Sequence, residues 1–217
     1  MTLLNSEENT AIHLYPGITQ ADKYQSRNWI SRKLVNSFMH AILKTVKEAG
    51  SKKVHEIGCG EGHIISVLAS HGFDVRGCDI SEESLKVAEG ELLKRNLGIP
   101  LSIKSIYDLN EKQDASDTVI CCEVLEHLTD PELALKKLVT ITKKDLIVSV
   151  PNEPIWHILN MMRGKYLNAL GNTPGHYQHW SKNQFVKFVA KRAEIISVKT
   201  PLPWTLIHCR PYNRVSS

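Results

Sequence analysis

The stretch VHEIGCGEGH, residues 54–63, decides how this chain folds. A short apolar run contains an acid, Glu56, and glycines then occupy positions 58, 60 and 62. This order predicts a strand, a tight turn and a helix. Such a turn places backbone N–H groups and the positive end of the helix against a ligand. Because glycine has no side chain, we expect the backbone here to approach a bound molecule closely.

Outside this stretch, short apolar runs alternate with amphipathic segments. We expect helices at residues 62–71 and 81–98 and after Asp130, with Ser81 and Asp130 as N-caps, Pro131 in the first turn and Gly98 as a C-cap. The expected strands are KKVHEIG, FDVRGCD, LSIKSI, DTVICCEV, DLIVSV, EIISVKT and PWTLIHC. This alternation predicts an α/β fold with a doubly wound, mostly parallel, seven-stranded sheet.

The domain organisation follows from two changes of pattern. Residues 26–48 have helical apolar spacing, so residues 1–50 are predicted to form an N-terminal helical cap on a single domain at 51–217. From 151 to 180 the alternation stops, and prolines, glycines, aromatics and histidines gather. We interpret 151–180 as a lid, because a long irregular segment rich in aromatics is seldom disordered. Residues 181–184, SKNQ, form a capping box that opens the next helix.

Composition bounds the class of protein. The chain has 217 residues, a formal net charge of +4, 42% hydrophobic and 23% charged residues, which is typical of a globular protein. Five cysteines without framework spacing indicate reduced thiols and a cytoplasmic protein. The N-terminus lacks the layout of a secretory signal, and no apolar run approaches the roughly 20 residues of a membrane span. The basic residues are scattered in pairs, a pattern that favours solvated helix faces over a nucleic-acid-binding surface. Separately, we expect a monomer or a homodimer.

The next predicted strand ends in Asp79, whose carboxylate could accept hydrogen bonds from both hydroxyls of a ribose. The ligand is therefore expected to be a nucleoside-bearing cofactor. A nicotinamide dinucleotide favours G-x-G-x-x-G, whereas the spacing here is G-x-G-x-G. Glu56 is also poorly placed beside a pyrophosphate. It suits a cofactor with a cationic amino group, such as S-adenosylmethionine.

Three motifs now carry a resemblance. VHEIGCGEG, CDIS at 78–81 and CCEVLEHLTDP at 121–131 resemble motifs of class I S-adenosylmethionine-dependent methyltransferases, in particular the ubiquinone-biosynthesis O-methyltransferase branch. The resemblance covers residues 24–150 well and the two final strands loosely. It implies a Rossmann-like fold, S-adenosylmethionine as cofactor and an enzyme that methylates an acceptor, but it says little about the acceptor.

Carried over residue by residue, the resemblance implies a cofactor site. Glu56 would contact the methionine amino group, Asp79 the ribose and Ile80 the adenine face. The other implied contacts are Gly58, Cys59, Gly60 and Gly62 beneath the cofactor, Ser105 and Ile106 at the adenine, the backbone of Cys121 and Cys122 at the methionine, and Arg32 at its carboxylate. The family often has an acid at position 105, so Tyr107 and Asp108 are alternatives for the adenine contact.

Methyl transfer to a hydroxyl requires that a base remove its proton. The candidate bases are Glu123, Glu126, His127, His157, His176 and His179. The candidates for the acceptor walls are Trp156, Tyr177 and Trp180. The alternative is that His127 starts a helix and that the two lid histidines satisfy backbone groups. His176-x-x-His179 lacks a nearby cysteine pair and no carboxylates clearly converge, so no metal site is predicted.

The sequence therefore predicts methylation of a small molecule, most often at oxygen, without a metal. Two alternatives stay open. One is an RNA-associated methyltransferase or a non-catalytic module that binds a nucleotide cofactor. The other, disfavoured by the glycine spacing and Glu56, is an NAD-dependent oxidoreductase.

Overall fold

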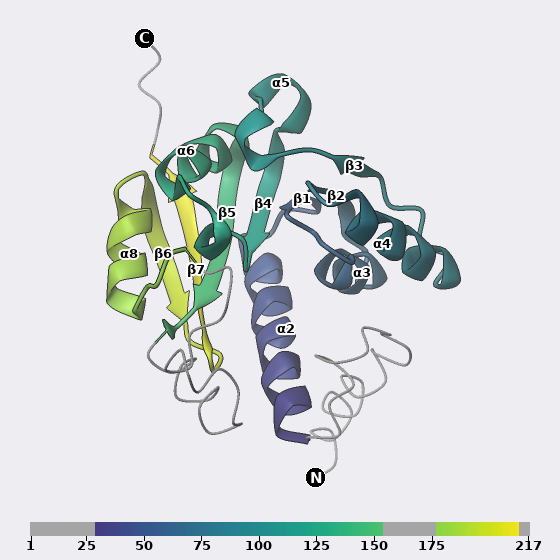
Figure 1. The fold of residues 1–217 in the computed structure, drawn as a ribbon, viewed down its shortest axis with the longest axis horizontal. Helices are drawn as coiled ribbons and strands as arrows, with labels where there is room; N and C mark the ends of the chain where they lie inside the picture. The colour runs from purple at the N-terminus through teal and green to yellow at the C-terminus, as the bar shows by residue number, and fades with distance from the viewer. Residues whose placement is uncertain (1–28, 154–176, 213–217) are drawn as a thin grey trace.

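The computed structural model describes residues 29–153 and 177–212 (Figure 1). Its centre is a seven-stranded sheet in the order β3-β2-β1-β4-β5-β7-β6. The strands are β1 (Lys53–Ile57), β2 (Asp74–Asp79), β3 (Leu101–Ile103), β4 (Ser116–Cys122), β5 (Thr142–Pro151), β6 (Ala193–Lys199) and β7 (Trp204–Pro211). The first five run parallel, and β7 pairs antiparallel with both β5 and β6. This arrangement confirms the predicted α/β fold.

Helices cover both faces of the sheet (Figure 1). On one face lie α2 (Trp29–Ala49), α3 (His63–Ser70) and α4 (Glu82–Lys94), and on the other lie α6 (Pro131–Ile141) and α8 (Lys182–Ala190). The connections hold α5 (Glu111–Asp114) and the short 3₁₀ helices η1 (Ile106–Asp108) and η2 (Leu125–His127). The predicted caps are confirmed: Ser81 caps α4, Asp130 caps α6, and Ser181 forms a capping box with Gln184 at α8.

The core has two layers separated by the sheet. In β4, Val119 and Cys121 face α6 and α8, whereas Ile120 and Cys122 face α2 and α3. All four side chains are buried. A strand buried on both faces reads as a continuous apolar run, which explains why VICC carries no alternation.

Two predicted boundaries were wrong. The helix expected to reach Gly98 ends at Lys94, because Asn96 adopts a left-handed conformation (φ 55°) and the N–H of Leu97 bonds back to Leu92. Asparagine can close a helix in this way, as glycine does. The strand expected over LSIKSI stops at Ile103, and the hydroxyl of Ser105 instead accepts from the Tyr107 N–H at the start of η1.

The helix α2 is fastened to the sheet through β6 and β7. The ring of Phe38 stacks on Trp204 with a centroid separation of 4.5 Å, and Lys199 reaches Thr45 and Glu48 from β6. Within residues 29–153 and 177–212, no helix has the length and apolar character that crossing a bilayer requires. Most of the predicted lid, residues 154–176, lies outside the described residues.

Candidate active site

The glycine loop leaves the carboxyl end of β1 and leads into α3. The N–H groups of Gly58 and Cys59 both donate to the Cys78 carbonyl of β2, at 2.8 and 3.0 Å. The loop is therefore fastened to the neighbouring strand. In open α/β sheets, ligands bind outside the carboxyl ends of the strands, where this loop lies.

The three glycines of the loop have three different surroundings. A Cβ at Gly58 would stand 2.3 Å from Cγ2 of Val124, and one at Gly62 would stand 3.2 Å from Ala88 of α4. A Cβ at Gly60 would meet no atom within 4 Å. Of the three, Gly60 alone faces open space, so the position of Gly60 fits close approach of a ligand. Gly58 makes room for the protein itself, which the sequence had not indicated.

Asp79 is held at the end of β2 by two backbone donors. Its Oδ2 accepts from the Gly60 N–H and its Oδ1 from the Ser81 N–H, both at 2.8 Å. Each carboxylate oxygen keeps a second lone pair. A pair of ribose hydroxyls could use these lone pairs, as the sequence predicted. The adjacent side chain of Ile80 is 73% exposed, a position that fits an aromatic base packed over it.

Glu56 is buried in β1, with 2% of its surface exposed, and its Oε2 has no hydrogen-bond partner among the described residues. Burial raises the pKa of this carboxyl well above its usual range, and nearby Asp79 adds to the rise. A buried carboxylate with an unsatisfied oxygen is costly unless a donor reaches it. A cationic amino group at this position would supply that donor, so Glu56 fits the predicted cofactor.

The remaining predicted cofactor residues lie around this edge in different settings. Cys59, Cys121 and Cys122 are buried, and the Ile106 side chain points into the core. Ile106 could therefore offer only its backbone to an adenine. Ser105 lies next to Ile106 and caps η1. Arg32 is exposed on α2.

Glu123 directly follows β4 and is tied down by two side chains. Its backbone has φ of 59°, which is uncommon for a residue other than glycine. Its Oε1 accepts from the Ser149 hydroxyl at 2.9 Å, and its Oε2 accepts from the Trp204 Nε1–H at 2.6 Å. If Glu123 acted as a general base, the hydroxyl of the acceptor would have to compete with these two donors for the carboxylate oxygens. Ser149 and Trp204 were missed, since nothing near Glu123 in the sequence signals them.

Two buried glutamates lie beside the half-buried Glu123, and we call Glu123, Glu126 and Glu153 the acidic edge. Glu126, in η2, is 1% exposed, and neither carboxylate oxygen has a hydrogen-bond partner among the described residues. Burial raises its pKa well above the usual range, with further contributions from Glu123 and Glu153. Glu153 follows β5, and its Oε1 lies 3.5 Å from Nδ1 of His179. The sequence offered no signal for Glu153.

Residues 177–180, at the end of the segment predicted as a lid, lie against this edge. The N–H groups of Tyr177 and Gln178 both donate to the Glu126 carbonyl, at 2.9 and 3.0 Å. The Tyr177 side chain is 66% exposed, as an acceptor wall requires. The Trp180 ring instead packs on Phe185 and Phe188 of α8, so it anchors the segment.

The other candidate bases are less defined. His127 is exposed at the end of η2, and its N–H donates to the Val124 carbonyl. The candidates His157, His176 and Trp156 lie outside the described residues. No group of three His, Cys, Asp or Glu side chains in the described ranges is arranged to hold a metal ion.

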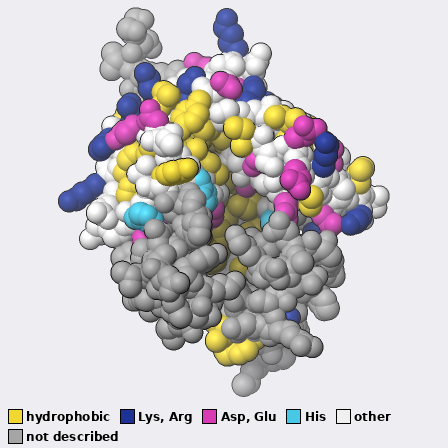
Figure 2. Space-filling model, viewed as in Figure 1, with side chains coloured by type: hydrophobic (Ala, Val, Ile, Leu, Met, Phe, Trp, Pro, Cys, Tyr) yellow, Lys and Arg dark blue, Asp and Glu magenta, His cyan; other side chains and the backbone are white. Residues whose placement is uncertain are grey.

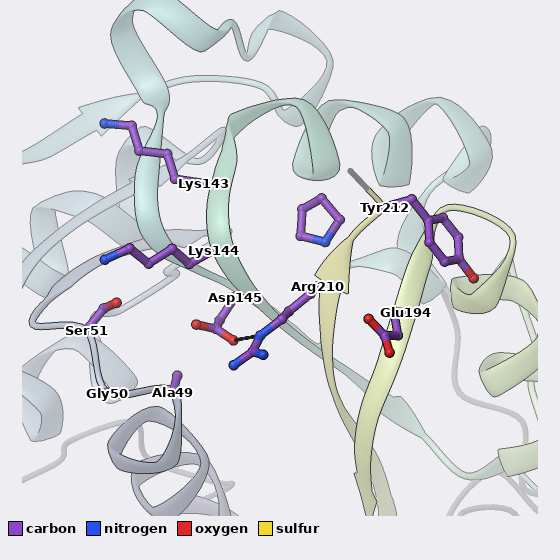
Figure 3. A pocket seen from close by; sticks show the side chains of 10 residues that line it. Ala49, Gly50, Ser51, Lys143, Lys144, Asp145, Glu194, Arg210 and Tyr212 are labelled. Carbon is purple, nitrogen blue, oxygen red and sulfur yellow. Dashed lines mark hydrogen bonds and ion pairs between the residues drawn. The ribbon is translucent and has the colours of Figure 1, made fainter. Parts of the chain in front are cut away.

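Figure 2 shows this face hollowed at its centre, with hydrophobic side chains on the floor and acidic side chains at the margin. A separate groove of about 580 Å³ is drawn in Figure 3. It lies at the start of β5 and the end of β7, where Arg210 reaches across to Asp145. That is the opposite end of the parallel strands from Asp79, so this groove is not the cofactor site.

Comparison with known proteins agrees with this placement. Residues 55–149 match the family described as a methyltransferase domain. The ubiquinone biosynthesis O-methyltransferase of Idiomarina loihiensis is 41% identical over 86 residues, which cover 39% of this chain and 35% of that protein. The enzyme of the same name from Chromobacterium violaceum is 38% identical over 93 residues, which cover 42% of this chain and 40% of that protein. The chain thus matches well under half the length of these relatives.

Solved structures extend the likeness over most of the chain. The magnesium protoporphyrin IX methyltransferase of Synechocystis, crystallised with S-adenosylhomocysteine, is 19% identical, covers 95% of each chain and gives a TM-score of 0.65. The small RNA methyltransferase HEN1 is 20% identical, and the match covers 82% of this chain and 25% of the HEN1 chain with a TM-score of 0.66. These matches confirm the predicted Rossmann-like fold.

Proposed function

We propose that this chain, whose residues 55–149 form a methyltransferase domain, uses S-adenosylmethionine to methylate a hydroxyl oxygen of a small molecule. The observation that carries the cofactor assignment is the pairing of Asp79 with Gly60. A carboxylate fixed by two backbone N–H groups stands beside a glycine that faces open space. That combination suits a ribose whose hydroxyls need acceptors and whose ring needs room.

Different residues would bind different parts of the cofactor. Asp79 would accept from the ribose hydroxyls, Glu56 from the methionine amino group, and Ile80 would cover the adenine. S-adenosylmethionine supplies a methyl group on a sulfonium, which is an activated leaving group. The chain therefore has to position the acceptor and take its proton. For this reason we propose that the reaction needs no metal.

The acceptor end is proposed to be the acidic edge and the segment around Tyr177. His179 stands with Nδ1 next to Glu153, so Nε2 is the atom that would take the hydroxyl proton, while Glu153 orients the ring. His176 stays a second candidate from the sequence. Methylation at oxygen is supported by the names of the curated relatives, ubiquinone biosynthesis O-methyltransferases.

Calorimetric titration tests the cofactor. We expect S-adenosylmethionine and S-adenosylhomocysteine to bind, and NAD to show no binding. Asp79→Asn keeps the shape but replaces one acceptor oxygen by a donor and removes the charge, so binding should weaken by about 2–4 kcal/mol. Asp74→Asn, an exposed carboxylate at the other end of β2, is the matched control. Binding of NAD in place of both adenosyl ligands would overturn the proposal.

Methyl transfer is then measured with a labelled methyl group and a panel of phenols, catechols, amines and RNA. Each acceptor is assayed with magnesium and with EDTA. Turnover on a hydroxyl acceptor that EDTA leaves intact is the expected result. Turnover confined to RNA, or abolished by EDTA, would contradict the proposed acceptor class or the metal-independent chemistry, respectively.

A further inference from the structure

Gly77 lies inside β2, two positions before Asp79, and does not belong to the glycine loop. In the sheet β2 runs between β1 and β3, and Gly77 pairs with Glu56 on one side and with Leu101 on the other. Its φ is not positive, so the backbone conformation does not require glycine. A glycine inside a strand weakens the strand, and it often marks a place where another backbone approaches closely.

The group that approaches Gly77 is the side chain of Cys59, which comes from the glycine loop. A Cβ on Gly77 would stand 2.9 Å from Sγ and 3.1 Å from Cβ of Cys59, and 3.3 Å from the flexible end of Leu101. Atoms in contact prefer about 3.5–4.0 Å, so the separations from Cys59 are too short. The sulfur could rotate away, but the Cβ of Cys59 is bonded directly to the loop backbone. A side chain at position 77 would therefore displace the loop itself.

Two sets of hydrogen bonds join the loop to β2 next to this contact. The loop donates two N–H groups to the Cys78 carbonyl, one of them from Cys59 itself. The following residue, Gly60, donates its N–H to the Asp79 carboxylate at 2.8 Å. A displacement of Cys59 would therefore move Gly60 away from the carboxylate that is proposed to receive the ribose.

The size of the Cys59 side chain, and not its reactivity, matters for this contact. Cys59 is 6% exposed and packs in the core layer on the α2 and α3 face of the sheet. Burial raises the pKa of its thiol far above the ordinary value, and nearby Glu56 and Asp79 add to the rise. The thiol is therefore neutral near pH 7, and the neutral form is neither a good nucleophile nor a good metal ligand.

Building on the proposed function, we propose that Gly77 and Cys59 are positioning residues for the cofactor. The absent side chain at position 77 and the small side chain at position 59 set how closely the glycine loop approaches β2. That separation fixes the pairing of Gly60 with Asp79, and the pairing presents the carboxylate to the ribose. Both side-chain positions act through the loop, without a contact of their own to the cofactor.

The experiment combines calorimetric titration with S-adenosylhomocysteine and hydrogen exchange of the Gly60 N–H by NMR. Gly77→Ala should weaken binding about 10- to 100-fold, the effect of disturbing one hydrogen bond to a charged group. It should also speed exchange of the Gly60 N–H relative to the amides of β4. Gly90→Ala, within α4, is the matched control, because a Cβ there would meet no atom within 4 Å. The control should change neither quantity.

Substitutions at position 59 give a signature that a general loss of stability would not. With Gly77 present, Cys59→Ala and Cys59→Gly should each weaken binding, because they loosen the loop. In the Gly77→Ala protein the same two changes should strengthen binding, because they remove first the Sγ and then the Cβ that the added methyl group meets. Cys59→Gly should recover about tenfold in affinity there, and the opposite signs in the two backgrounds measure the coupling directly.

Several outcomes would overturn the inference. One is a Gly77→Ala protein that is less stable in urea but binds with wild-type affinity, and another is the same sign of effect at position 59 in both backgrounds. If Gly77→Ala does not fold by circular dichroism, the protein that also carries Cys59→Gly should fold and bind, and its failure to fold would count equally against the inference. If neither adenosyl ligand binds the wild-type chain, the proposed function itself fails, while exchange of the Gly60 N–H still tests how the loop is seated.

Discussion

At the scale of single residues, Gly58 and Gly60 share one turn but serve different partners. We predict that Gly58→Ala lowers the free energy of unfolding by about 2–3 kcal/mol, because its Cβ would overlap Val124. Gly60→Ala has free space around its Cβ and should cost only about 1 kcal/mol for its left-handed backbone. It should nevertheless weaken S-adenosylmethionine binding. Urea unfolding and calorimetry measure the two effects, and normal binding by Gly60→Ala would contradict the ligand assignment.

A second residue-scale prediction concerns the base. His179→Gln should reduce turnover by roughly 10²–10⁴ while cofactor affinity is preserved, because a positioned base contributes about that factor. His127→Gln, at the exposed end of η2, is the matched comparison and should retain most activity. If both variants keep full turnover, the base lies elsewhere, and His176 is the next candidate to mutate.

The residues that could be predicted are those whose chemistry is local. Glu56, the glycines and Asp79 follow from strand ends and turn spacing, and the structure brings them together. Trp204 could not be predicted as a partner of Glu123, because the two lie 81 positions apart. Their contact depends on the strand order of the finished sheet. The position of Glu153 beside Glu126 could not be predicted for the same reason.

At the scale of elements, Trp204 joins α2 to the end of β4. Its ring stacks on Phe38, and its Nε1–H donates to Glu123. Trp204→Phe keeps an aromatic ring but leaves one carboxylate oxygen without this donor. We predict a loss of about 1–3 kcal/mol of stability in urea unfolding.

Ser149→Ala removes the donor to the other oxygen of Glu123 and serves as the comparison. Because the two donors share one carboxylate, their effects should not be additive in the double variant. A Trp204→Phe protein as stable as wild type would show that the stacking alone fastens α2.

Element boundaries were predictable where a cap is chemically distinct. Ser81, Asp130 and Ser181 each start a helix as expected. The end of α4 was predicted wrongly because Asn96, and not Gly98, adopts the left-handed conformation that ends the helix. Both residue types tolerate this conformation. The residue types alone therefore do not tell whether Asn96 or Gly98 ends the helix.

At the scale of the whole molecule, His55 links global stability to pH. It is buried, its Nδ1–H donates to the Asp114 carbonyl at 2.9 Å, and burial lowers its pKa to about 4. The unfolded chain therefore binds a proton below its ordinary pKa of about 6.5, whereas the folded chain resists it. Stability present above that pH is lost as the pH falls from about 6.5 toward about 4.

We expect urea unfolding to show about 2 kcal/mol of this loss between pH 7 and pH 5. His55→Gln keeps a side-chain donor but cannot titrate, so its stability should fall less over the same range. Identical pH dependence in the two proteins would exclude His55 as a source of acid sensitivity.

The strand order also bears on how the protein is made. β7 follows β6 in the sequence, yet it lies between β5 and β6. Until β7 has emerged from the ribosome, the nascent chain presents β5 with an open edge, and such edges recruit other chains. The residue that begins β7 is Trp204, which also delivers the bond to Glu123. Synthesis of β7 therefore closes this edge of the sheet and brings the Trp204 donor to Glu123 in the same event.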